Sequence, residues 1–176
     1  MNDKDSRISI QLSHIIFITG GTKSGKSEFA EYLAKVENNP EYKKWQKKIN
    51  LHRKRRPKNW KLIETTDLLN TLSKEDGPLL IDSIGGFVME SINKEDKVWF
   101  IKMNSLINLL KKRKSKTFIV GEQVGWSLVS EYKIGNTYIE RIGELQKSIT
   151  KISKDNWLAI NGRAIKIDEI SLEIPT

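Results

Sequence analysis

The sequence predicts an α/β protein with a mostly parallel β-sheet and helices on both faces. Short apolar runs, typical of buried strands, alternate with segments whose apolar residues recur at helical spacing. A glycine-rich turn joins the first strand to the first helix. The prolines at positions 40, 57 and 175 fall between the expected elements, and Pro78 is the first residue of an expected strand.

The elements follow from local patterns. The β-branched run at 15–19 (IIFIT) predicts a strand that stops at Gly20-Gly21, and the segment after Ser27 has helical spacing. The later elements are expected as a helix at 65–73, a strand at 78–84, a helix at 98–114, a strand at 117–122, a helix at 137–153, and strands 157–162 and 164–167 in a hairpin around Gly162-Arg163. In the helix at 98–114 the inward face is expected to hold Phe100, Met103, Leu106, Ile107 and Leu110.

Length and composition indicate a folded protein without a membrane span. The 176 residues are most simply a polar N-terminal extension over 1–14 and one domain over 15–176. No apolar run approaches the roughly 18 residues that a membrane-spanning helix needs, and the first residues lack the apolar core of a signal peptide. Cysteine is absent, which excludes disulfides and thiolate metal sites and agrees with a cytoplasmic protein.

The net charge of +9 is concentrated in one segment. Residues 43–61 hold ten Lys and Arg and no Asp or Glu, which leaves 21 basic and 22 acidic residues elsewhere. Such a patch suits either a nucleic acid or a polyphosphate. The second basic run, 111–116 (KKRKSK), ends an expected helix, and we interpret it as a solvated last turn that the helix dipole favours.

The stretch GGTKSGKS matches the phosphate-binding pattern G-x-x-x-x-G-K-[ST] and has the required strand before it and helix after it. Glycines let the backbone approach a phosphate, and the amides at the helix start point at it. Lys26 is expected to reach the terminal phosphates and the Ser27 hydroxyl to bind Mg²⁺. The pattern therefore predicts a P-loop nucleoside-triphosphatase fold. Its candidate nucleotide-binding residues are Gly20, Gly21, Thr22, Lys23, Ser24, Gly25, Lys26 and Ser27.

Asp82 ends the apolar run LLID, where a P-loop fold places a second carboxylate on the metal side. We therefore expect Asp82 to join Ser27 at the Mg²⁺ and nucleotide site. The alternative role of Asp82 is to cap the segment that follows.

The stretch HRKRRPKNW, residues 52–60, combines a histidine with five basic residues. A histidine in a basic loop is more often solvated than catalytic, so the residues alone leave its role open. In this stretch the chain resembles the bifunctional adenosylcobinamide kinase / adenosylcobinamide-phosphate guanylyltransferase family of cobalamin biosynthesis. Segments similar to the same family, over about residues 15–167, are FITGGTKSGKSEFAE, WKLIE, LLIDSI, IVGEQVGWSLV and WLAINGRAIKI.

The resemblance implies two reactions at one site of a RecA-like P-loop enzyme that assembles as a homotrimer. ATP or GTP would phosphorylate the aminopropanol hydroxyl of adenosylcobinamide, a corrinoid. GMP from GTP would then pass through a histidine, matched here by His52, to the phosphorylated corrinoid. The residues that match the family's nucleotide contacts are Arg53, Lys54, Arg55, Arg56 and Glu64.

Physical chemistry agrees with this role for His52. Imidazole is a nucleophile only when neutral, and neighbouring cations disfavour its protonated form. The same cations would bind the triphosphate and stabilise charge on the leaving pyrophosphate.

Three departures from the family pattern affect substrate recognition. The segment before the histidine is shorter and shows no convincing strand at 37–48. Gly85, Gly86 and Glu90 stand after Asp82, where the family often has Thr and Asn, and Gln146-Lys147 replaces an Asn-Gln pair.

Three alternatives remain beside the bifunctional enzyme. The chain could be a P-loop kinase without guanylyl transfer, a nucleic-acid-binding nucleoside triphosphatase that uses 43–61, or a silent nucleotide-binding subunit. Few aromatic residues interleave the basic segment, which argues against nucleic acid as a partner.

Overall fold

The computed structural model of the protein describes residues 13–38, 61–126 and 130–175. Strands and helices alternate along this part of the chain, which confirms the α/β class that the sequence predicts. In chain order the elements are β1 (Ile15–Gly20), α1 (Lys26–Asn38), α2 (Leu68–Lys74), β2 (Leu79–Asp82), α3 (Gly85–Glu90), α4 (Asp96–Lys112), β3 (Thr117–Glu122), α5 (Lys133–Ile152), β4 (Asp155–Ile160), β5 (Arg163–Lys166) and α6 (Ile167–Ile170).

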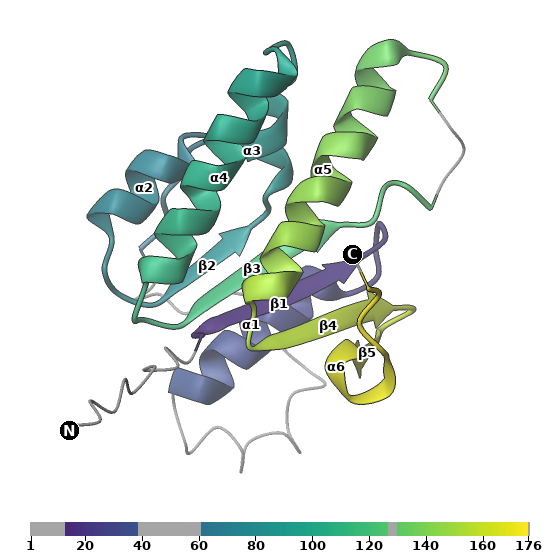
Figure 1. Cartoon of the computed structure of the whole chain (residues 1–176). Helices are drawn as coiled ribbons and strands as arrows, with labels where there is room; N and C mark the ends of the chain where they lie inside the picture. The colour runs from purple at the N-terminus through teal and green to yellow at the C-terminus, as the bar shows by residue number, and fades with distance from the viewer. Residues whose placement is uncertain (1–12, 39–60, 127–129, 176) are drawn as a thin grey trace, which may run out of the picture.

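The described strands form one mostly parallel sheet in the order β2-β3-β1-β4-β5, with β1 at its centre (Figure 1). β1 runs parallel to β3 and β4, β2 runs parallel to β3, and β5 is antiparallel to β4. Gly20 of β1 lies opposite Glu122 of β3, and Asp82 of β2 lies opposite Val120. The three strand ends therefore meet at one edge of the sheet.

Helices cover both faces of this sheet (Figure 1). On one face, Ala30 and Ala34 of α1 pack against Ile18 of β1 and its neighbours on β3. On the other face Phe17 joins a larger cluster with α3, α4 and α5. Successive residues of β1 point to opposite faces, and both faces are covered, which explains why this central strand is buried throughout and apolar from Ile15 to Ile18.

Several helices differ from the sequence expectation in detail, and α5 begins at Lys133, four residues before its expected start at 137. α2 begins at Leu68 because the Asp67 carboxylate accepts a hydrogen bond from the backbone N–H of Asn70 at 3.1 Å and caps the helix. On α4 the expectation that Phe100 faces inward is wrong, since its side chain is 42% exposed. Trp99 is buried instead and packs against Phe87, with ring centroids 6.0 Å apart.

The expected hairpin is present, but its turn lies one residue earlier than predicted. Asn161 and Gly162 both have positive φ angles, 49° and 74°, as a two-residue turn between antiparallel strands requires. Arg163 is the first residue of β5 and pairs with Ile160. The short helices α3 and α6 were not expected from the sequence.

The described residues include no helix with the length and apolar character needed to cross a bilayer.

Candidate active site

The loop between β1 and α1 has a backbone conformation that depends on glycine. Gly25 has a φ of 93°, a region that L side chains rarely adopt. A Cβ at Gly20 would overlap the carbonyl oxygen of Ala159 and lie 2.7 Å from Ser24 Oγ. The loop wraps closely because these two positions carry no side chain.

One buried polar group of the loop has no hydrogen-bond partner. Lys26 Nζ donates a hydrogen bond to the Gly21 carbonyl at 3.1 Å, and the Gly162 N–H donates to the Ser24 carbonyl at 3.0 Å. The Ser24 hydroxyl is buried without a hydrogen-bond partner. Buried polar groups are nearly always satisfied, and a phosphate oxygen in the loop would supply the missing partner.

The first turn of α1 meets the end of β2 at this edge. Ser27 Oγ donates a hydrogen bond to Asp82 Oδ1 at 3.1 Å. The pair offers a hydroxyl and a carboxylate oxygen, the hard oxygen ligands that Mg²⁺ takes beside the phosphates of a nucleotide. No three His, Cys, Asp or Glu side chains gather as a metal site within residues 13–38, 61–126 and 130–175.

A second carboxylate, Glu122, lies at the end of β3 between the loop and β2. Its Oε1 accepts a hydrogen bond from the Ser83 hydroxyl, and its Oε2 is buried without a partner. A Cβ at Gly85 would lie 2.5 Å from the Tyr138 hydroxyl and 2.9 Å from Glu122 Oε1. Burial, with a smaller effect of the Glu122 charge, raises the pKa of Tyr138 above its ordinary value.

Three amide and hydroxyl side chains fix the end of β3 to the rest of this edge. The Thr19 hydroxyl donates to Gln146 Oε1 at 2.7 Å and accepts from Gln123 Nε2 at 3.0 Å. Gln146 Nε2 in turn donates to the Glu122 carbonyl at 3.0 Å. The sequence pattern predicts no role for these residues, although Gln146 departs from the family pattern.

The structure brings together one part of the residue set that the sequence predicts. The loop Gly20–Ser27, including Thr22 and Lys23, lies beside Asp82. Glu64 is exposed in the chain that leads to α2. The remaining predicted residues lie outside the described residues: His52, Arg53, Lys54, Arg55 and Arg56.

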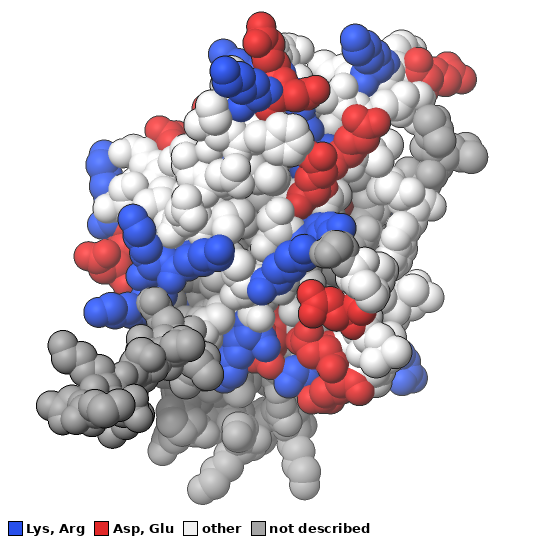
Figure 2. All heavy atoms as spheres, in the orientation of Figure 1, with Lys and Arg blue, Asp and Glu red and all other residues white. Residues whose placement is uncertain are grey.

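The surface of the described residues carries both signs of charge. Figure 2 shows Lys and Arg side chains interspersed with Asp and Glu on the face in view. This agrees with the near balance of 21 basic and 22 acidic residues outside 43–61.

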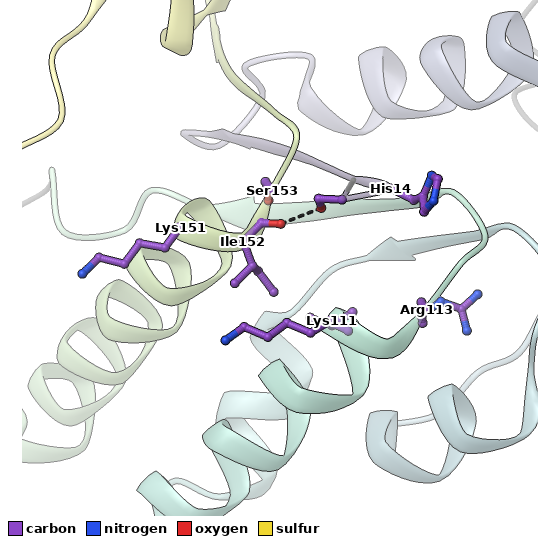
Figure 3. A pocket seen from close by; sticks show the side chains of 8 residues that line it. His14, Lys111, Arg113, Lys151, Ile152 and Ser153 are labelled. Carbon is purple, nitrogen blue, oxygen red and sulfur yellow. Dashed lines mark hydrogen bonds between the residues drawn. The ribbon is translucent and has the colours of Figure 1, made fainter. Parts of the chain in front are cut away.

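A hollow of about 390 Å³ lies at the opposite end of the sheet, where β1 begins and α4 and α5 end (Figure 3). Ser13 Oγ donates to the Ile152 carbonyl at 2.6 Å at its wall. Lys111 and Lys151 sit in the last turns of α4 and α5, where cations complement the helix dipoles. We therefore interpret Lys111 and Lys151 as residues that stabilise the ends of these two helices.

The basic run 111–116 is not solvated throughout, because Arg113 is partly buried and hydrogen-bonded. Its guanidinium donates to the carbonyls of Glu75 and Gly77 and to Thr117 Oγ1. Burial lowers its pKa, and the charges of Asp76 and Glu75 partly offset this effect. Arg113 therefore holds the end of α4 to the chain before β2.

The strand order, the glycine loop with Lys26, and the Ser27–Asp82 pair together define a P-loop nucleotide-binding protein of the α/β class. Residues 16–167 match the family model described as cobinamide kinase / cobinamide phosphate guanyltransferase. The chain therefore belongs to this family, whose members combine the two activities in cobalamin biosynthesis.

Two curated relatives agree with this membership at low identity. The bifunctional adenosylcobalamin biosynthesis protein CobU of Escherichia coli (strain K12) is 24% identical over 179 residues, covering 87% of this chain and 99% of the relative. The protein of the same name from Salmonella typhimurium (strain LT2) is 22% identical over 181 residues, with the same two coverages.

Proposed function

We propose that this chain phosphorylates adenosylcobinamide and then transfers GMP from GTP to the product, giving adenosyl-GDP-cobinamide. Family membership supports the pair of reactions. The observation that carries the proposal is the Ser27–Asp82 contact of 3.1 Å beside a complete phosphate loop. A nucleoside triphosphate and its metal would bind beside this hydroxyl, this carboxylate and the ammonium of Lys26.

In the first reaction the loop binds the triphosphate of ATP or GTP. Backbone N–H groups of Gly20–Ser27 and the Lys26 ammonium would contact the phosphates, and the buried Ser24 hydroxyl would gain its partner. Ser27 and Asp82 would hold Mg²⁺, which supplies neutralisation of charge on the phosphate oxygens. The corrinoid hydroxyl oxygen would bond to the γ-phosphorus as the bond to the nucleoside diphosphate breaks.

In the second reaction we assign the nucleophile to His52. Its neutral imidazole would attack the α-phosphorus of GTP and release pyrophosphate. A phosphate oxygen of the phosphorylated corrinoid would then attack the same phosphorus and restore the imidazole. Arg53, Lys54, Arg55, Arg56 and Glu64 would contact the nucleotide, as their match to the family motif implies.

Two further parts of the proposal concern assembly and location. We propose that the chain works as a homotrimer and in the cytoplasm. The sequence has no cysteine, which is compatible with a reducing compartment. Size-exclusion chromatography with light scattering would test the trimer, and a single-chain mass would refute it.

Product analysis tests the function as a whole. Purified chain, Mg²⁺, ATP, GTP and adenosylcobinamide are incubated and the corrinoids are separated by mass spectrometry. Both the phosphate and the GDP derivative are expected. The phosphate alone would leave a kinase that has lost guanylyl transfer, and neither product would refute the proposal. Tight, salt-sensitive binding to DNA or RNA in the same preparation would favour the nucleic-acid alternative for 43–61.

A further inference from the structure

The carboxylate of Glu122, at this edge of the sheet, has one oxygen, Oε2, that is buried without a hydrogen-bond partner. The other oxygen, Oε1, accepts a hydrogen bond from the Ser83 hydroxyl. A buried acceptor without a partner destabilises the folded state, so it needs a physical reason. A ligand that donates a hydrogen bond would provide that reason.

The position of Glu122 places it beside the phosphate loop. Glu122 lies opposite Gly20 in the β1–β3 register, and the N–H of the next residue, Gln123, donates to the Gly20 carbonyl at 3.0 Å. On its other side Ser83 directly follows Asp82, which contacts Ser27. The carboxylate is therefore flanked by the two elements that bind the nucleotide and its metal in the proposed function.

The two carboxylates of this edge have different surroundings. Asp82 is exposed and contacts Ser27. Glu122 is half-buried, accepts a hydrogen bond from the Ser83 hydroxyl, and borders, together with the Tyr138 hydroxyl, the space beside Gly85. The Tyr138 phenol is protonated at neutral pH, and burial raises its pKa further, so it can donate a hydrogen bond near the carboxylate. Two carboxylates in unlike environments can take unlike roles in one reaction.

We propose that Glu122 is the general base of the kinase reaction and that its free Oε2 accepts the proton of the corrinoid hydroxyl. The inference rests on the proposed kinase function. The hydroxyl O–H bond breaks, the proton moves to Oε2, and the oxygen forms a bond to the γ-phosphorus. The bond between that phosphorus and the β,γ-bridging oxygen breaks, and the nucleoside diphosphate leaves with its electron pair. Atoms and charge balance without another reactant.

The shielding of Oε2 from water has a functional reason in this scheme. Water is itself a phosphoryl acceptor, and a base open to solvent would activate it and hydrolyse the nucleotide. The terminal torsion of a glutamate is broad, so a small rotation presents Oε2 to an incoming hydroxyl. The backbone of Glu122 stays fixed meanwhile, because Gln146 holds its carbonyl at 3.0 Å.

A purely structural role for Glu122 makes a different prediction. If the carboxylate only positions β2 through Ser83, then removing the Ser83 hydroxyl should impair the reaction as much as removing the carboxylate. If Glu122 is the base, then Ser83→Ala should keep most of the rate, because Oε2 retains its acceptor lone pairs.

The test measures transfer of ³²P from γ-labelled ATP to adenosylcobinamide, together with nucleotide affinity and self-labelling by α-labelled GTP. Glu122→Gln keeps the shape but loses the base, and Glu140→Gln, an exposed residue on α5, is the matched control. For Glu122→Gln we expect kcat of phosphorylation to fall about 10²–10⁴-fold, with nucleotide Kd and self-labelling within about threefold of the wild type. Glu122→Ala should recover part of its rate with added formate, which a structural role would not produce.

Several results would overturn the proposal. One is a phosphorylation rate for Glu122→Gln within about fivefold of the wild type. A second is a phosphorylation rate that falls as much in Ser83→Ala as in Glu122→Gln. A third is a loss of nucleotide affinity in Glu122→Gln as large as its loss of rate. A fourth is the failure of formate to restore any rate to a Glu122→Ala protein that still binds nucleotide. An inactive wild type would instead refute the kinase function itself, so the two failures are distinguishable.

Discussion

Adjacent glycines at the start of α3 provide a matched pair of substitutions at the edge of the active site. A Cβ at Gly85 would lie 2.5 Å from the Tyr138 hydroxyl and 2.9 Å from Glu122 Oε1, both far inside normal contact. A Cβ at Gly86 would meet only Thr66 Cγ2, at an ordinary 3.8 Å. Gly85→Ala and Gly86→Ala thus make the same chemical change in crowded and open surroundings.

The difference between the two variants isolates the crowding at Gly85. Alanine in place of glycine in a helix stabilises by up to about 1 kcal/mol, and overpacking a buried site costs roughly 1–3 kcal/mol. Gly86→Ala should therefore be neutral or more stable than the wild type. Gly85→Ala should lie about 1–3 kcal/mol below Gly86→Ala, which corresponds to about 2–12 °C in Tm for a chain of this size.

Thermal unfolding followed by circular dichroism measures this difference, and urea titration provides an independent value. The double variant Gly85→Ala with Tyr138→Phe removes the hydroxyl that the new methyl group meets, so it should recover part of the loss. Equal stability of the two single variants would refute the reasoning. It would mean that Tyr138 and Glu122 do not occupy the space above Gly85.

Three further outcomes follow from individual contacts. Arg141 is almost fully buried and donates to the carbonyl of Ser91 at 2.6 Å and to the exposed Asp96 carboxylate at 2.9 Å. Arg141→Leu should therefore lower the free energy of unfolding, measured by urea titration, by about 2–4 kcal/mol. Asp96→Asn should lower it by less than about 1 kcal/mol, because Asp96 is exposed. The pKa of Tyr138 is raised in the folded protein, so the protein should lose stability as the pH rises from about 10 towards the folded-state pKa. In an ultraviolet titration, Glu122→Gln should lower the pKa of Tyr138 by removing a nearby negative charge, while the effect of burial remains. Ser27→Ala should weaken binding of Mg²⁺-nucleotide by more than about tenfold with little effect on Tm, as measured by calorimetry with and without Mg²⁺.

The sequence predicts the phosphate-binding half of the site because that half is local. The residues from Gly20 to Ser27 are contiguous, and the pattern itself fixes the strand before them and the helix after them. Asp82 follows from the same logic, since carboxyl ends of parallel strands meet at one edge. In the structure Asp82 Oδ1 accepts a hydrogen bond from Ser27 Oγ at 3.1 Å, and the role of the pair at a metal stays a prediction.

The other half depends on contacts between segments that are far apart in the chain. Ser83 and Glu122 are 39 residues apart, and Thr19 and Gln146 are 127 residues apart. No periodicity in a single segment encodes such pairs, because register and helix placement decide them. The prediction that Phe100 faces inward failed for a related reason: a shift of one residue on a helix turns the side chain by about 100°, and Trp99 fills that site.

The proposal of guanylyl transfer depends on residues in the basic segment 43–61. His52 and its basic neighbours lie outside the described residues, so their role as a nucleophile and its phosphate-binding shell stays a prediction. The extent of the single domain over 15–176 is likewise a prediction.

Covalent labelling with α-³²P GTP and Mg²⁺ tests the central proposal most directly, with the wild-type chain compared to His52→Ala. We expect the wild type to acquire an acid-labile, alkali-stable label, as a phosphorus–nitrogen bond to imidazole requires, and His52→Ala to acquire none while still binding GTP. A label of the same stability in both proteins would contradict the assignment of His52. The absence of label from a wild type that binds GTP would contradict guanylyl transfer through this chain.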